Sequence, residues 1–71
     1  MTWNELLQAA STGIMPKVKR GDSIGTVTTI KHKGKYKGCA VDFGYDWDDW
    51  FHAETQNDKR SKYMAELELI I

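Results

Sequence analysis

The spacing of apolar residues divides the chain into a short helix and a longer β-rich region. Four residues recur at the three- and four-residue spacing of one helix face, namely Trp3, Leu6, Leu7 and Ala10. Thr2 and Glu5 form a capping box at the start of this helix, and Gly13 with Pro16 ends it. About three turns are unstable alone in water. We therefore expect a helix over residues 2–12 whose apolar face docks on the rest of the protein.

After the helix, the sequence takes on the character of a β-sheet. Residues 24–30 are rich in β-branched side chains, which favour strands. Residues 36–43 alternate, with Cys39, Val41 and Phe43 on one face, and the glycine and polar residues before them predict a hairpin turn. A second connection then leads to a short strand predicted at residues 50–53.

The last nine residues allow two interpretations. Every second residue falls on one apolar face: Tyr63, Ala65, Leu67, Leu69 and Ile71. Glu66 and Glu68 fall on the opposite face, which favours a strand. A helix would instead bring together Tyr63, Leu67, Ile70 and Ile71, and the segment is rich in good helix formers. We prefer the strand because the alternation is regular over the whole segment.

These elements predict a mainly β protein with one domain over residues 1–71. The chain has 71 residues, which is too few for two hydrophobic cores. We expect one N-terminal α-helix over residues 2–12 and a small closed or half-closed antiparallel barrel of four or five short strands over residues 17–71. The helix covers one open end of the barrel through Trp3, Leu6 and Leu7. The expected inner face of the sheet consists of Val18, Val27, Cys39, Val41, Phe43, Phe51, Leu67 and Leu69.

Four segments of the β-rich region carry a resemblance to a known fold. They are KRGD (19–22), GTVTTI (25–30), GKYKGCAVDF (34–43) and WF (50–51). Their order resembles an SH3-like barrel of the KOW or Tudor kind, over about half of the chain. The resemblance implies a binding module for RNA, ribosomal surfaces or peptide segments rather than an enzyme. A short chain of this type would also suit a bacterial or phage accessory protein.

Composition excludes several other classes of protein. One cysteine cannot form an intrachain disulfide, and the Cys and His spacing supplies no zinc site, so we expect no cofactor and no metal. The first residues resemble neither a signal peptide nor a membrane span, which predicts a cytoplasmic protein. Cys39 shares a face with Val41 and is expected to be buried, so we do not expect a Cys/His nucleophile with His32 or His52.

The net charge is zero, but the charges are segregated along the chain. Residues 16–38 contain seven basic residues and one acid, and residues 39–58 contain six acids and no base. Two interpretations stay open. Neighbouring strands could neutralise one another, or one charged segment could face a partner of opposite charge.

The predicted hairpin tip is the first candidate site. Its residues are Lys31, Lys33, Lys35, Tyr36 and Lys37. Four ammonium groups on one projecting loop form a plausible contact surface for phosphates, and the tyrosine ring can stack on a base. Lysine at a hairpin edge also protects against edge-to-edge pairing of strands, which is the structural alternative.

The segment after the hairpin is the second candidate site. It consists of Tyr45, Asp46, Trp47, Asp48, Asp49 and Trp50. Rings bracketed by carboxylates attract cationic groups, and the resemblance implies that Tyr45, Trp47 and Trp50 correspond to the aromatic cluster of Tudor-type barrels. A calcium loop is excluded because Trp50 occupies a position that needs an oxygen ligand. The structural alternative is that Trp50 and Phe51 belong to the core.

The sequence therefore predicts a small non-enzymatic binding module. Our first hypothesis is a protein partner that binds the acidic aromatic segment, and the alternative is a nucleic acid that binds the basic hairpin. Neither hypothesis specifies the identity of the partner or the oligomeric state.

Overall fold

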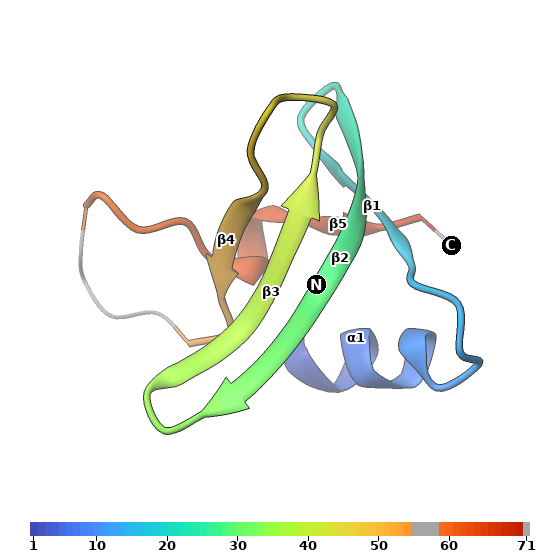
Figure 1. Ribbon diagram of the computed structural model, residues 1–71, viewed down its shortest axis with the longest axis vertical. Coiled ribbons are helices and arrows are strands. Elements are labelled where there is room, and N and C mark those ends of the chain that lie inside the picture. Colours follow the sequence, from blue (N-terminus) through green and yellow to red (C-terminus); the bar gives the residue numbers. More distant parts are fainter. Residues whose placement is uncertain (55–58, 71) are drawn as a thin grey trace.

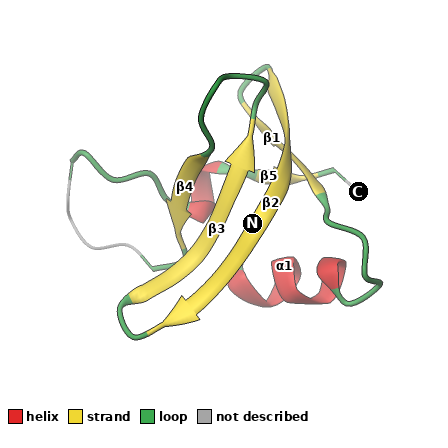
Figure 2. Cartoon of the chain, viewed as in Figure 1, coloured by secondary structure: helices red, strands yellow, loops and turns green. Residues whose placement is uncertain are grey.

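The computed structural model describes residues 1–54 and 59–70, and Figures 1 and 2 show the arrangement of their helices and strands. In chain order the elements are α1 (Trp3–Ala10), β1 (Lys17–Arg20), β2 (Ser23–Lys33), β3 (Tyr36–Asp42), β4 (Asp49–His52), the 3₁₀ helix η1 (Met64–Glu66) and β5 (Glu68–Leu69). The prediction of a mainly β protein with one N-terminal α-helix is confirmed. No helix in the described ranges is long and apolar enough to cross a membrane.

The strands form one antiparallel sheet in the order β4-β3-β2-β1-β5. The last strand returns to the first, where Leu69 pairs with Val18. The sheet is open rather than closed, because β5 has only two residues and pairs with β1 alone among the described strands. The free edge of β4 is partly covered, since the His52 amide donates to the Lys62 carbonyl oxygen at 2.8 Å.

The β2–β3 hairpin is the longest element and determines which side chains face inward. Its register pairs Ile30 with Cys39 and Lys33 with Tyr36. A two-residue connection closes it, and Gly34 adopts a φ of 59°, a left-handed conformation that glycine reaches without steric cost. Because side chains alternate along both strands, one face of the hairpin carries the apolar side chains of the core and the other carries Lys31 and Lys33.

The core lies between the inner face of the sheet, α1 and the 3₁₀ segment. Its buried side chains are Leu6, Val18, Val27, Cys39, Val41, Phe51, Met64 and Leu67. Phe43 and Leu69 pack against this cluster but are only partly buried. The prediction that Leu7 packs inward is wrong, because Leu7 is 43% exposed and Leu6 alone is buried on α1.

Hydrogen bonds at the start of α1 cap the helix and connect it to the C-terminal segment. Within the capping box, the Glu5 amide donates to Thr2 Oγ1 at 3.1 Å and the Thr2 amide donates to Glu5 Oε1 at 2.8 Å. The Met1 amino group donates to the carbonyl oxygens of Met64 and Leu67. The start of α1 is therefore tied to the segment that precedes β5.

The continuous strand predicted over the last nine residues is wrong. Met64 and Leu67 are buried and lie three residues apart, which matches the period of the 3₁₀ turn, and Ala65 is exposed. Strand pairing is confined to Glu68–Leu69. Ile71, which we placed on the apolar face of this strand, lies outside the described residues.

The Glu66 carboxylate holds the 3₁₀ turn in place. It accepts hydrogen bonds from the Tyr63 amide at 2.7 Å and from Arg20 at 3.0 Å. These two donors, the amide first, lower the pKa of Glu66.

Leu67→Ala should lower the free energy of unfolding by about 2–5 kcal/mol, because it removes a fully buried side chain that the surroundings cannot replace. Ile24→Ala is the matched control. Ile24 is 61% exposed, and truncating it should change the free energy of unfolding by no more than about 0.5 kcal/mol. Urea denaturation followed by circular dichroism measures both values, and equal losses in the two variants would contradict the assignment of the core.

Candidate functional site

The loop between β3 and β4 exposes two aromatic rings among carboxylates. Tyr45 is 61% exposed and Trp47 is 60% exposed. Their rings stack with centroids 5.2 Å apart and an interplanar angle of 12°. Asp46 and Asp48 flank Trp47 and are also exposed. We call Tyr45, Asp46, Trp47 and Asp48 the acidic–aromatic loop.

Side-chain hydrogen bonds fix both ends of the acidic–aromatic loop. At its start, Asp42 Oδ1 accepts from the Gly44 amide at 2.7 Å. At its end, Asp48 Oδ2 accepts from Thr28 Oγ1 at 2.7 Å, and Thr28 lies at the irregularity in β2 where the register shifts between Val27 and Thr29. The loop is therefore anchored, and its stacked rings are presented without the cost of ordering a free segment.

Asp49 and Trp50, the last two residues of the predicted acidic site, do not join this loop. Asp49 is partly buried and forms a 2.8 Å ion pair with Lys62. Trp50 belongs to β4 and pairs with Ala40, so its side chain points to the outer face of the sheet, on the side opposite Phe51. Phe51 is fully buried, as expected of a core residue, and Trp50 is half-buried.

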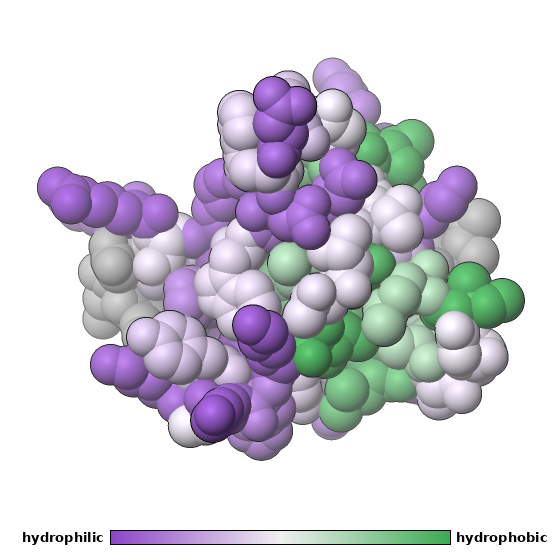
Figure 3. Space-filling model, viewed as in Figure 1, coloured by the Kyte–Doolittle hydropathy of each residue, from purple (hydrophilic) through white to green (hydrophobic). Residues whose placement is uncertain are grey.

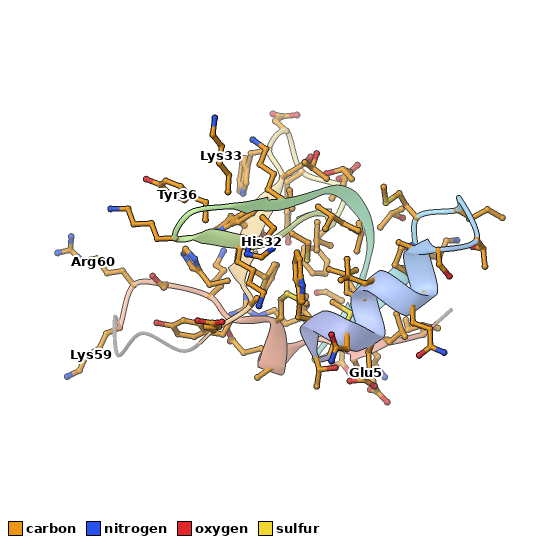
Figure 4. The ribbon with its side chains drawn as sticks, turned by 90° about the horizontal axis from the view of Figure 1, so that it is seen from below. Glu5, His32, Lys33, Tyr36, Lys59 and Arg60 are labelled. Atoms are coloured by element: carbon orange, nitrogen blue, oxygen red, sulfur yellow. The ribbon has the colours of Figure 1, made fainter. Side chains whose placement is uncertain are left out.

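The outer face of the hairpin and β4 gathers basic and aromatic side chains. The register places Lys31 beside Gly38 and His52, and places Lys33 beside Tyr36. Figure 4 shows Lys33 and Tyr36 projecting from the same side of the hairpin. A hollow of about 520 Å³ is lined by Lys31, Lys33, Tyr36, Trp50 and His52. We call these five residues the basic–aromatic face.

Trp50 and His52 hold each other in position on this face. The Trp50 indole N–H donates to His52 Nδ1 at 3.2 Å, and the two rings are nearly perpendicular, at 87°. Gly38 forms the sheet backbone between them and the hairpin lysines, and a Cβ there would collide with the Phe51 backbone. The close approach of β3 to β4 therefore requires this glycine.

The other two lysines of the predicted hairpin site lie elsewhere. Lys37 belongs to the opposite face, where its Nζ lies 5.4 Å from the centroid of the Trp3 ring and 3.5 Å from Glu54. His32 is on that face too, in edge contact with Trp3. Lys35 lies in the turn, with Nζ 5.8 Å from the centroid of the Tyr36 ring.

Among the described residues, ion pairs between the two charged segments are few. Across residues 1–54 and 59–70, the pair of Lys37 and Glu54 is the ion pair that joins the basic segment to the acidic one. Lys31, Lys33 and Asp46 form no ion pair within the same ranges. Asp58, which was counted with the acids, lies outside the described residues.

Cys39 is fully buried within the core, as expected. Burial raises the pKa of its thiol to about 11, so the reactive thiolate is scarce at neutral pH. Within the part of the chain that the structure describes, no group of three or more His, Cys, Asp or Glu residues is arranged to hold a metal ion.

Comparison of the chain with protein-family models, with curated proteins and with solved structures finds no significant match. The functional argument therefore depends on the geometry of the two surfaces.

Sequence reasoning missed the association of Trp50 and His52 with the hairpin lysines. The local signal was present, since residues on either side of a buried Phe51 in a strand must face outward. The sequence pattern did not show which residues these side chains would lie beside. Only the pairing of β3 with β4 brings Trp50 and His52 next to Lys31.

Cys39 should resist modification by a thiol reagent in the folded protein at neutral pH, because it is both buried and protonated. It should react fully once the protein is unfolded in guanidinium chloride. Colorimetric thiol titration measures both states, and rapid reaction of the folded protein would contradict the structural role that we assign to Cys39.

Proposed function

We propose that the protein is a small non-enzymatic binding module that holds single-stranded nucleic acid on its basic–aromatic face. The observation that carries this proposal is the hollow in which Lys31 and Lys33 share a lining with Tyr36, Trp50 and His52. Ammonium groups supply the attraction to phosphates, and ring faces supply stacking surfaces for bases. Both elements of single-strand binding are thus present in one place.

The charge state of the two lysines supports the proposal. Lys31 and Lys33 are exposed and make no ion pair with the residues described, so their charges are not compensated by neighbouring carboxylates. A phosphate that binds these two lysines would displace solvent and counterions and would not have to break an ion pair within the protein.

The residue types on the basic–aromatic face favour binding that does not depend on the base sequence of the nucleic acid. Arginine, whose fork reads base edges, is not among the lining residues, and lysine acts as a point charge. Stacking tolerates any base because every base has a π-face. Bases held inside a duplex are not available for such stacking, so the expected ligand is a single strand.

We propose an SH3-like barrel as the fold family. This is supported by the return of β5 to β1, which brings the last strand next to the first as in a barrel that is partly closed. The resemblance of the sequence to KOW and Tudor barrels points to binding rather than catalysis, and a short chain of this type would suit an accessory protein. The free and buried Cys39 fits a reducing compartment, so we propose a cytoplasmic location.

A protein partner at the acidic–aromatic loop is the second candidate function. The stacked and exposed pair of Tyr45 and Trp47 favours it, because large exposed aromatic side chains that lie together are typical of protein–protein interfaces. The loop is also anchored by Asp42 and Asp48, so it is presented in one conformation.

Lys33→Glu should abolish most binding to a fluorescently labelled oligothymidylate, because it replaces a phosphate contact with a repelling charge. The slope of log affinity against log salt should become shallower by about 0.7 for each phosphate contact that is lost. Lys17→Glu makes the same change of charge on β1, outside the hollow, and is the matched control. Fluorescence anisotropy measures all three proteins.

Trp50→Ala should weaken the same binding by about tenfold to a hundredfold, the value of one stacked base. A thermal melt checks that this variant is folded. If Lys17→Glu and Lys33→Glu weaken binding equally, or if a duplex of the same length binds as well as the single strand, the proposed function is wrong.

A further inference from the structure

The protein carries two exposed surfaces with matching chemistry and opposite charge. The basic–aromatic face presents Lys31 and Lys33 beside three rings, and the acidic–aromatic loop presents Asp46 and Asp48 beside two. The carboxylates of the loop correspond to the phosphates of a nucleic acid. Its indole and phenol rings correspond to the bases. It therefore resembles, in its chemistry, the ligand that we propose for the face.

The hairpin lysines and the acidic–aromatic loop lie toward opposite ends of β3, and Trp50, which pairs with Ala40, lies between them. Tyr36 begins this strand next to the hairpin turn, and Asp42 ends it just before the loop. Seven strand residues span about 20 Å. Figure 1 shows the β3–β4 loop at one end of the hairpin and the β2–β3 turn at the other, and Figure 3 shows hydrophilic surface over both ends. Because the loop is anchored to β2 and β3, it cannot fold back onto the face of its own copy.

Electrostatics also favours contact between copies. The net charge of the chain is zero, so no overall repulsion keeps copies apart. The charges are unpaired at both surfaces: Lys31, Lys33 and Asp46 form no ion pair across the described residues. Opposite charges that find no partner within a copy are available to one another between copies.

We propose that the acidic–aromatic loop of one copy binds the basic–aromatic face of a second copy, with Trp47 entering the hollow between Tyr36 and Trp50. The proposal rests on the proposed function in one respect, namely that the same face binds nucleic acid. The contact joins two different surfaces, so it is heterologous: the copy that contributes its loop keeps a free face, and the copy that contributes its face keeps a free loop. The result is an open chain of copies, and single-stranded nucleic acid competes with the loop for the face.

Sedimentation velocity at low salt tests the association. The wild-type protein should form species larger than a monomer that increase with protein concentration and disappear at high salt, where exposed charges are screened. Trp47→Ala and Lys33→Glu should each remain monomeric at concentrations where the wild type associates. Ile14→Ala, which truncates a side chain that is 74% exposed and belongs to neither surface, should associate like the wild type.

Mixing the two monomeric variants gives the decisive result. Trp47→Ala retains an intact face and Lys33→Glu retains an intact loop, so an equimolar mixture can form one native contact. The mixture should therefore form a dimer that does not grow further, because the two remaining surfaces are both defective. A mixture that stays monomeric, or single variants that associate like the wild type, would overturn the proposal.

Oligonucleotide binding separates this inference from the proposed function. Trp47→Ala has an intact face that no loop occupies, so it should bind oligothymidylate at least as tightly as the wild type. Added oligothymidylate should also convert the wild-type oligomers to monomers. If the variants mix to a dimer but no protein binds the oligonucleotide, the association stands and the nucleic-acid function fails. If Trp47→Ala binds the oligonucleotide and the wild type is monomeric at every concentration, the function stands and the association fails.

Discussion

The register of β3 between β2 and β4 is the constraint on which the rest of the structure depends. It aligns Ile30, Cys39 and Phe51 across the three strands on the inner side. On the outer side the same register aligns Lys31 with His52. A slip of one residue would exchange the two sides, placing lysine in the core and cysteine on the surface. The hydrophobic core and the basic–aromatic face are therefore two consequences of one pairing, and burial of the core side chains holds the face in place.

Segregation of charge is the second organising feature, and the fold preserves it. The hairpin carries its lysines toward the β2–β3 turn, while the acids of the β3–β4 loop collect at the other end of the same strands. Internal pairs such as Lys37 with Glu54 are exposed, and pairs of this kind contribute at most about 1 kcal/mol. The net charge of the chain is zero, but Lys31, Lys33 and Asp46 on the two surfaces form no ion pair among the described residues.

Both surfaces combine charge with ordered aromatic rings, and in each case a hydrogen bond supplies the order. His52 accepts from the Trp50 indole on the face. Thr28 donates to Asp48 at the end of the loop that carries Tyr45 and Trp47. Rings held in this way lose little conformational freedom on binding, which leaves more of the stacking energy for affinity. A chain of 71 residues thus presents two surfaces with ordered aromatic rings around a small core.

The sequence alone determined the elements whose signals are local: the capped helix, the β2–β3 hairpin with its glycine turn, and the alternation that buries Cys39 and Val41. It also separated the charges. Tertiary structure decided the rest. The final segment forms a 3₁₀ turn that buries Met64 and Leu67 in the core before it pairs with β1, a partner some fifty residues away. Trp50 lies beside the hairpin lysines rather than in the acidic–aromatic loop because β4 pairs with β3, and local periodicity does not reveal the register between two strands.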